Sequence, residues 1–434
     1  MITPKVLRIG LFGALFAVFF LISIFAILNT GDETLNPQAK TWLDLRAAES
    51  PSLQKALALA ASLEWREKTG KPAGDAIVGD VRNANANENP KRWDALVQLR
   101  KKYDRATIPS PRACDDGRSL CASNDREEAL REIEAVKTEL SLYRELLKED
   151  GLAEIIKPSM LAPELLSSRL LIMARFDLMD LSLQIEKSPA AVAAQLADRA
   201  KFWKKVLKVP TTVMIKMIAI SNLESLSLFA RNWVLADLEP GAALSSKSLV
   251  SQIPALKVGV GAEMIREIIE PSLAIELQYS ADVCEMVRHR PAKVLTEWMN
   301  LGGESEAATD STVGKVILGR TLMAGFQANR TLNQMFRIHA LALSPECVED
   351  PKNTKCINLQ NLSSGESWLD GFRNPIGKRL IAVFASSLPQ HAHRAKMNLT
   401  RHNDTLELVA RALEQPSDEV IKKLRGEAQK TAAR

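Results

Sequence analysis

Four of the five cysteines in this chain form two close pairs. Cys114 and Cys121 enclose DDGRSL, and Cys347 and Cys356 enclose VEDPKNTK, two polar stretches rich in turn-forming residues. Neighbouring cysteines in such exposed loops are natural disulfide partners in an oxidising compartment. We therefore predict two disulfides, each of which closes a short loop and stabilises the fold by about 2–3 kcal/mol.

Zinc binding is the alternative for both pairs, but structural zinc sites usually place paired cysteines about two to four residues apart. These pairs enclose six and eight residues, a spacing that favours disulfides. The fifth cysteine, Cys284, lies in the apolar stretch YSADVCEMV, where we expect a buried free thiol. His391 and His393 point to different faces of a helix, and His391 and His402 lie about 16 Å apart along it. We therefore expect neither a metal ion nor another cofactor.

Glu224 is the residue best suited to acid–base catalysis. It precedes Ser225 in ISNLESLSLFA, the most apolar helical stretch of the chain, and apolar surroundings favour the protonated carboxyl group that a general acid needs. Helical lytic transglycosylases of the cell envelope also use a glutamate followed by a serine, but their Gly-Leu-Met-Gln signature has no counterpart here. The alternative is a structural carboxylate paired with Lys216 or Arg231.

Asp177 and Asp180 share one face of a predicted helix and interrupt its apolar stripe. We expect an ion pair with an arginine from another helix, and a metal site is the less favoured interpretation. The chain lacks the G-x-S-x-G and H-E-x-x-H motifs and a complete phosphate-binding glycine motif. The sequence therefore assigns no catalytic residue, with Glu224 kept as the alternative.

The N-terminus carries an uncharged run of twenty residues from Ile9 to Leu28. As a helix this run spans about 30 Å, the thickness of a bilayer's hydrocarbon core. Lys5 and Arg8 precede it, so the positive-inside rule places residues 1–8 in the cytoplasm and the bulk of the chain outside. A cleaved signal peptide is the alternative, but the run is long and ends without a small-x-small cleavage site. We therefore predict a single-pass anchor in the bacterial inner membrane, with the lipid bilayer as partner.

The remainder of the chain has the composition of a globular helical protein. About 46% of residues are apolar and 25% are charged, and helical periodicity with capping residues is common. These features predict an all-α fold. The net charge of +5 is small for 434 residues, and basic residues are interspersed with acidic ones, which argues against nucleic acid as a partner.

Capping residues and periodicity also predict individual elements. We expect a helix over 51–69, a charged and solvated helical arm over 124–150, and a long helix over 311–343. The stretch 71–92 is rich in Gly, Asn and Pro and is expected to be a loop. The apolar stretch 211–241 carries a charged residue about every two turns, so we expect a buried helix rather than a second membrane span.

These expectations divide the chain into a cytoplasmic N-terminus (1–8), a transmembrane anchor (9–28), a membrane-proximal region of helices and loops (29–123), a helical periplasmic body (124–415) and a basic C-terminal tail (416–434). We expect a protein that binds or scaffolds other cell-envelope components, as in secretion or appendage assembly. The alternative is a peptidoglycan-acting hydrolase or lyase that uses Glu224 as general acid. Gly10 and Ala14 have the spacing of dimerising membrane helices, which would allow a homo-oligomer.

Overall fold

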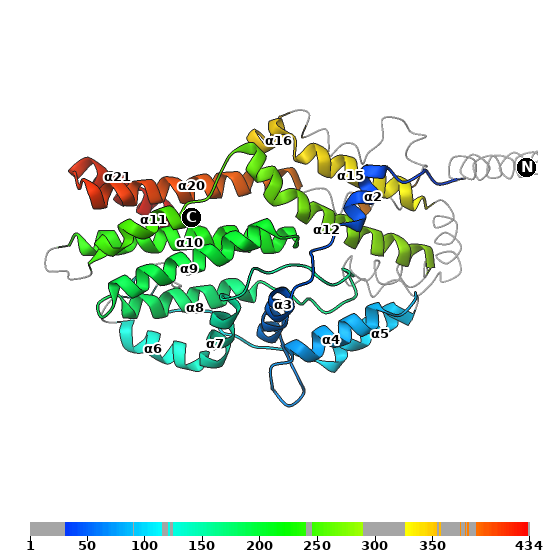
Figure 1. Cartoon of the computed structure of the whole chain (residues 1–434), viewed down its shortest axis with the longest axis horizontal. Helices are drawn as coiled ribbons and strands as arrows, with labels where there is room; N and C mark the ends of the chain where they lie inside the picture. Colours follow the sequence, from blue (N-terminus) through cyan, green and yellow to red (C-terminus); the bar gives the residue numbers. More distant parts are fainter. Residues whose placement is uncertain are drawn as a thin grey trace, which may run out of the picture. The chain divides into compact units, whose positions relative to one another are not determined.

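A computed structural model of the chain describes residues 31–89, 91–114, 120–121, 125–239, 245–289, 326–353 and 388–432, together with residues 356, 374, 378, 380 and 381 (Figure 1). The chain is mostly helical, with 71% helix and 2% strand, which confirms the all-α prediction. The predicted membrane anchor at 9–28 lies outside the described residues.

The chain divides into two compact units. Unit 1 comprises Met1–Asp44 and Leu277–Pro389, and unit 2 comprises Leu45–Glu276 and Gln390–Arg434. Two helices contain residues of both units, namely α12 (Ala262–His289) and α20 (Leu388–Glu414). Two of the three points at which the chain passes between the units therefore lie within helices, and the third, between Asp44 and Leu45, lies at the end of the helix α2 (Pro37–Asp44).

The regular secondary structure in the described part of unit 2 is helical apart from one short two-stranded sheet. Its helices, besides parts of α12 and α20, are α3 (Pro51–Glu64), α4 (Gly74–Asn85), α5 (Lys91–Lys102), α6 (Arg126–Ala135), α7 (Lys137–Leu146), α8 (Arg169–Gln184), α9 (Pro189–Lys208), α10 (Val213–Asp237), η3 (Ser246–Gln252), α11 (Ile253–Leu256) and α21 (Asp418–Ala432). The antiparallel strands β1 (Trp65–Arg66) and β2 (Asp104–Arg105) pair Trp65 with Arg105 and Arg66 with Asp104.

The apolar helix α10 packs against α8, α9, η3, α11 and α21. It is the one described helix that is long and apolar enough to cross a membrane, and 78% of its most apolar window is buried. The fully buried Lys216 donates from Nζ to the carbonyl oxygens of Val206, Leu207 and Val209 at 2.5–2.9 Å. Its ammonium group thus satisfies the last carbonyl groups of α9. These contacts place α10 in the core of unit 2. This agrees with the buried helix expected from the charged residues that recur along the stretch 211–241.

Residues 74–85 form the helix α4, so the prediction of a loop over 71–92 was wrong. Buried apolar side chains recur along α4 at helical spacing from Ile77 to Ala84. A Cβ at Gly74 would lie only 1.9 Å from the carbonyl oxygen of Ala58 on α3. The glycine that suggests a loop in the sequence therefore permits a close approach between two helices.

The segment expected as one solvated arm over 124–150 instead contains two helices, α6 and α7, that pack against other helices. Val136 interrupts the helix and separates α6 from α7. The helix α7 packs against α3 and α8 and buries Leu140, Tyr143 and Leu146. These three residues form one apolar face that packs against the neighbouring helices. The charged residues of α7 occupy its other faces.

Unit 1 contains α2 (Pro37–Asp44), α12 from Leu277 onward, α15 (Ala328–Ala342) and α16 (Pro345–Glu349). The helix expected over 311–343 begins at Ala328 within the described residues. The preceding Gln327 has an extended backbone (φ −112°, ψ 95°), and its N–H group donates to Asn374 Oδ1 at 3.0 Å instead of continuing a helix.

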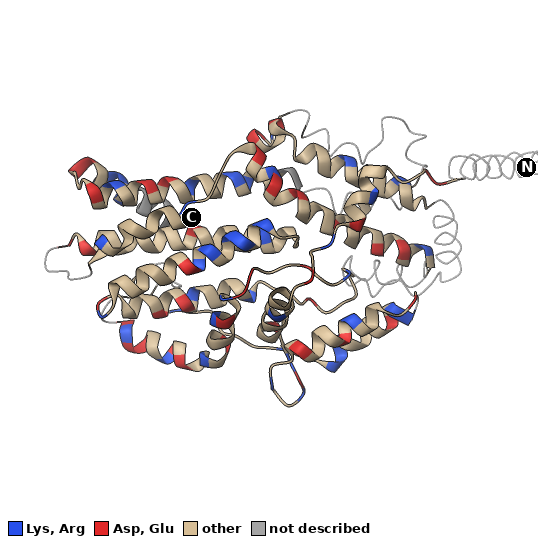
Figure 2. Cartoon of the chain, viewed as in Figure 1, with Lys and Arg blue, Asp and Glu red and all other residues tan. Residues whose placement is uncertain are grey.

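Acidic and basic residues are interspersed along the helices (Figure 2). The segment expected as a basic C-terminal tail contains the helix α21, which packs against α10 and buries Leu424 completely. The charged amphipathic helix α21 is thus packed against the core through an apolar side chain.

Candidate functional site

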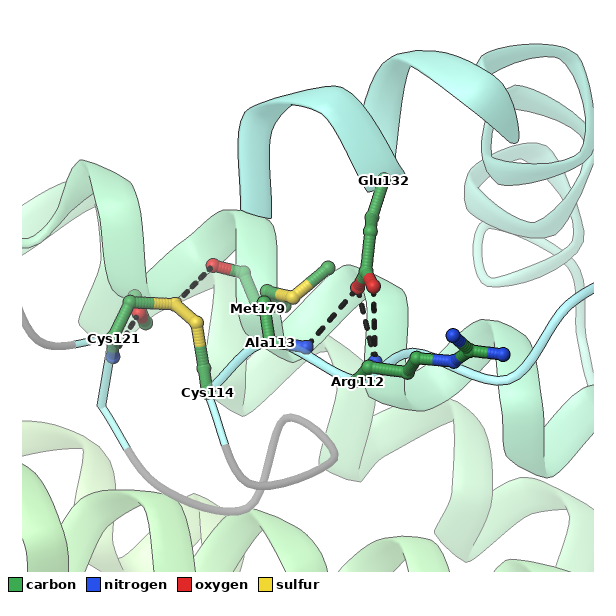
Figure 3. Close-up of a disulfide and its surroundings, with 7 residues drawn as sticks. Arg112, Ala113, Cys114, Cys121, Glu132 and Met179 are labelled. Atoms are coloured by element: carbon green, nitrogen blue, oxygen red, sulfur yellow. Dashed lines mark hydrogen bonds between the residues drawn. A yellow bond between two sulfur atoms is a disulfide. The ribbon is translucent and has the colours of Figure 1, made fainter. Parts of the chain in front are cut away.

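Both predicted disulfides are present, and the first lies in unit 2. Cys114 and Cys121 are joined with a Cα–Cα distance of 4.6 Å (Figure 3). The N–H group of Cys121 donates to Ser182 Oγ on α8 at 2.9 Å. The carboxylate of Glu132 on α6 accepts two backbone N–H groups immediately before Cys114, at 3.0 and 3.2 Å. The two ends of the loop are therefore fixed to different helices.

The second disulfide joins Cys347 to Cys356 in unit 1, with a Cα–Cα distance of 5.6 Å. Cys284 is a buried free thiol, as the sequence predicts, and burial raises its pKa to about 12. A thiol with such a pKa stays protonated at neutral pH and is a poor nucleophile. The cysteines thus serve the structure of the two units rather than catalysis.

Glu224 lies in an ion pair between two helices, and its side chain is 17% exposed. Its Oε1 accepts a hydrogen bond from Arg401 on α20 at 2.7 Å. Neither partner considered in the sequence occupies this position, because Lys216 bonds the end of α9 and Arg231 bonds Asn232. Glu224 thus connects α10 with α20 through this ion pair. The geometry supports a structural role for Glu224.

Asp177 and Asp180 on α8 form ion pairs with arginines from neighbouring helices, as expected from the sequence. Asp177 is 1% exposed and accepts from Arg144 at 2.8 Å and from Arg199 at 2.7 and 3.1 Å. Asp180 also pairs with Arg144. The two aspartates therefore connect α8 with α7 and α9.

An open groove of about 420 Å³ lies beside these ion pairs. It is lined mainly by α6 and α7, including Glu134, Lys137 and Glu145, and also by Lys148 just after α7 and Asp180 of α8. Small-molecule pockets are mostly apolar and enclosed. This groove is open and carries side chains of both charges, so it differs from such pockets.

The strap, which we define as residues 31–36, lies against the first turns of α15 in unit 1. The carboxylate of Asp32 accepts the backbone N–H groups of Asn329 and Arg330 at 2.8 and 3.0 Å. Such N–H groups have no partner within their own helix, and a negative charge is favourable at a helix N-terminus. Asp32 therefore caps α15 from a position 297 residues away in the sequence.

Side-chain amides of α15 hold the backbone of the strap. Asn333 donates from Nδ2 to the carbonyl oxygen of Thr34 at 2.9 Å, and its Oδ1 accepts the N–H group of Asn36 at 2.7 Å. Asn329, one turn earlier, donates to the carbonyl oxygen of Glu33 at 2.9 Å. The extended strap thereby gains the backbone hydrogen bonds that a neighbouring β-strand would otherwise provide.

The helix α2 continues the attachment beyond the strap. The ring of Trp42 meets Phe336 edge-on, with centroids 4.9 Å apart, and stacks on His339 at 6.3 Å. The carbonyl oxygen of Trp42 accepts a hydrogen bond from Gln278 on α12 at 3.0 Å. The strap and α2 together form one continuous contact with α12 and α15.

We expect Asn333→Ala to release the strap from α15. The substitution removes a donor and an acceptor that together hold two backbone groups, which costs about 1–3 kcal/mol. Amide hydrogen exchange of residues 34–36 should therefore become at least about fivefold faster, because local opening sets the exchange rate. Gln334→Ala on the same helix is the control and should leave the exchange unchanged. Equal exchange in both variants would show that Asn333 does not hold the strap.

Sequence analysis did not identify the strap. The one local signal is NRTLN, which places Asn329 and Asn333 on the same face of a helix. Amide side chains bond many kinds of partner, and no local pattern connects them with Asp32.

Among the residues that the structure describes, no group of three or more His, Cys, Asp or Glu side chains could hold a metal ion. The chain has no match among known protein families, curated proteins or solved structures.

Proposed function

We propose that this chain is a single-pass protein of the bacterial inner membrane that scaffolds other cell-envelope components. Residues 9–28 span the bilayer, the N-terminus is cytoplasmic, and both folded units lie in the periplasm. There the protein binds a partner, as in secretion or appendage assembly, without catalysing a reaction. The two disulfides are consistent with an oxidising compartment.

The strap is the observation that carries this proposal. It begins at Gly31, three residues after Leu28, the last residue of the apolar run. Three residues span at most about 11 Å, so the described part of unit 1 starts directly after the proposed membrane span. A flexible linker would let the folded units diffuse. A strap bonded along α15 instead suits a protein whose unit 1 is held close to the membrane.

The groove beside Asp180 is the surface that we assign to the protein partner. Its side chains of both charges match the polar rim of a protein interface. Acidic and basic residues are interspersed along the described helices (Figure 2), whereas proteins that bind nucleic acid cluster basic residues on one face.

Photo-crosslinking in cells tests this assignment. A photoreactive amino acid in place of Ser141, which lines the groove, should give a discrete adduct of higher mass. The same replacement at the exposed Lys247 on η3 is the control and should give none. Adducts at neither position, or equally at both, would contradict a binding function for the groove. An adduct of twice the chain mass would identify a second copy as the partner.

Glu224→Gln should leave the crosslinked adduct unchanged. The glutamine retains an acceptor for Arg401 but loses the charge, so we expect a loss of stability of about 1 kcal/mol. Thermal unfolding measures this change, and release of muropeptides from purified peptidoglycan measures catalysis. Release by the wild-type protein that is lost in Glu224→Gln would replace the scaffold proposal with a hydrolase or lyase.

A further inference from the structure

The Cys114–Cys121 disulfide lies in a series of contacts that connects α6 with α8 (Figure 3). On α6, the carboxylate of Glu132 accepts the two backbone N–H groups immediately before Cys114, at 3.0 and 3.2 Å. On α8, Ser182 Oγ accepts the N–H group of Cys121 at 2.9 Å. The Sγ atom of Cys121 also lies 3.9 Å from the carbonyl oxygen of Met179 on α8. The disulfide therefore completes a connection between the two helices.

Both of the connected helices are walls of the groove. On α6, Ile133 and Glu134 line the groove and follow Glu132 directly in the sequence. On α8, Asp180 lines the groove and follows Met179 directly. The residues that hold the disulfide are thus immediate neighbours of groove residues on both helices, so a change in this connection alters the shape of the groove.

The apolar packing of α6 is limited. Ala129 is fully buried, whereas Leu130 is 50% exposed. At the start of α6, Arg126 donates to the carbonyl oxygen of Leu183 on α8 at 3.4 Å and pairs with Glu186 at 3.5 Å. Both contacts are long, the side chain of Glu186 is 66% exposed, and exposed ion pairs contribute little to stability. The position of the later turns of α6 therefore depends largely on the contacts around the disulfide.

The disulfide supplies a short constraint that the chain alone does not. It holds the Cα atoms of Cys114 and Cys121 at 4.6 Å. The two cysteines are seven residues apart in the sequence, a separation that permits up to about 24 Å without the disulfide. Opening the disulfide therefore lets the anchors on α6 and α8 move apart.

The two disulfides differ in their access to a reductant. Cys121 is only partly buried, whereas Cys347 and Cys356 are 2% and 1% exposed. Thiol–disulfide exchange requires a thiolate to reach one sulfur atom of the disulfide. The Cys114–Cys121 disulfide is therefore the one that a reductant reaches more readily.

We infer that the Cys114–Cys121 disulfide is a redox-sensitive brace of the groove. A thiolate of a dithiol reductant attacks Cys121 Sγ, and Cys114 leaves as a thiolate that takes up a proton. The second thiol of the reductant then displaces Cys121 as a thiol. Two electrons and two protons pass to the cysteines, and the reductant becomes a disulfide. Reduction releases α6 from α8 and weakens partner binding, a consequence that rests on the proposed function of the groove.

Amide hydrogen exchange of the purified full-length chain in detergent tests the brace. Dithiothreitol, a dithiol, should make the exchange of residues 130–135 on α6 at least about fivefold faster, because local opening sets the exchange rate. Residues 140–146 on α7 should exchange as before, since α7 buries Leu140, Tyr143 and Leu146. Unchanged exchange of α6 after reduction would overturn the inference. So would a Cys114–Cys121 disulfide that dithiothreitol leaves intact in the folded chain, as measured by alkylation and mass spectrometry.

Variants separate the brace from other effects of the reductant. The double variant Cys114→Ser/Cys121→Ser should show the fast exchange of α6 without dithiothreitol. Glu132→Ala should also show it, with the disulfide intact, because it removes the anchor on α6. Cys347→Ser/Cys356→Ser, which removes the disulfide of unit 1, is the matched control and should leave the exchange of α6 unchanged. Exchange of α6 at the wild-type rate in Glu132→Ala would contradict the brace.

Crosslinking from position 141 then measures the effect on binding. The adduct should fall at least about threefold in Cys114→Ser/Cys121→Ser, because only the fraction of chains with an intact groove binds the partner. Fast exchange of α6 with an undiminished adduct would overturn the inference that reduction regulates binding. A wild-type chain without any adduct would instead overturn the proposed function, and the exchange of α6 would still decide whether the disulfide braces the groove.

Discussion

Replacing Asp177 with alanine should destabilise unit 2 by about 3–5 kcal/mol. Asp177 is 1% exposed and accepts hydrogen bonds from the guanidinium groups of Arg144 and Arg199. The side chain of Arg199 is only 11% exposed, so the substitution leaves a positive charge with little access to water. Removing one partner of a buried ion pair costs far more than the pair itself contributes.

Urea denaturation of the full-length chain measures this effect through the midpoint of unfolding. Glu127→Ala is the matched control, because Glu127 pairs with Arg131 at the surface. Their side chains are 86% and 78% exposed, respectively. The control should change stability by less than about 0.5 kcal/mol, since exposed ion pairs contribute little. A loss below about 1 kcal/mol for Asp177→Ala would show that the aspartate does not hold the three helices together.

Raising the pH should destabilise the folded chain through Glu154, by about 3–5 kcal/mol. Burial raises the pKa of Glu154 to about 8 in the fold, compared with 4.5 for an unperturbed glutamate. At pH values between 4.5 and about 8, Glu154 therefore retains a proton in the folded chain that it has released in the unfolded chain. The stabilisation is fully present below pH 4.5 and is lost as the pH rises through about 8.

Glu154→Gln isolates this contribution, because glutamine does not titrate. We expect the variant to be more stable than the wild type at about pH 9 and to show a flatter pH profile of the free energy of unfolding. Glu145→Gln, at an exposed position on α7, is the control and should follow the wild-type profile. Parallel profiles for wild type and Glu154→Gln would contradict the buried position of the carboxyl group.

Local features of the sequence predict parts of the fold correctly. Ser50 accepts the N–H group of Leu53 at 3.1 Å and starts α3 at Pro51, as expected from the capping pattern. The short spacing between Cys114 and Cys121 likewise predicts their disulfide. In each case the residues that interact are close in sequence, so that residue type and spacing are sufficient.

Features that depend on distant residues are not predictable in this way. The sequence shows that a glutamate in an apolar helix needs a partner, but Arg401 lies 177 residues from Glu224. Gly74 suggests a loop until the position of Ala58 is known. The same holds for the two features of the candidate site. The sequence predicts that Asp177 pairs with an arginine from another helix but does not say which arginine. The cap that Asp32 provides depends on the folded position of α15, which no local pattern predicts.

The proposed scaffold requires that both folded units lie in an oxidising compartment. Mass spectrometry of peptides from cells quenched with a thiol-alkylating reagent measures the state of each cysteine directly. A periplasmic location predicts disulfide-linked peptides that join Cys114 to Cys121 and Cys347 to Cys356, with Cys284 alone alkylated after unfolding. Alkylation of all five cysteines as free thiols would contradict that location and, with it, the proposed function.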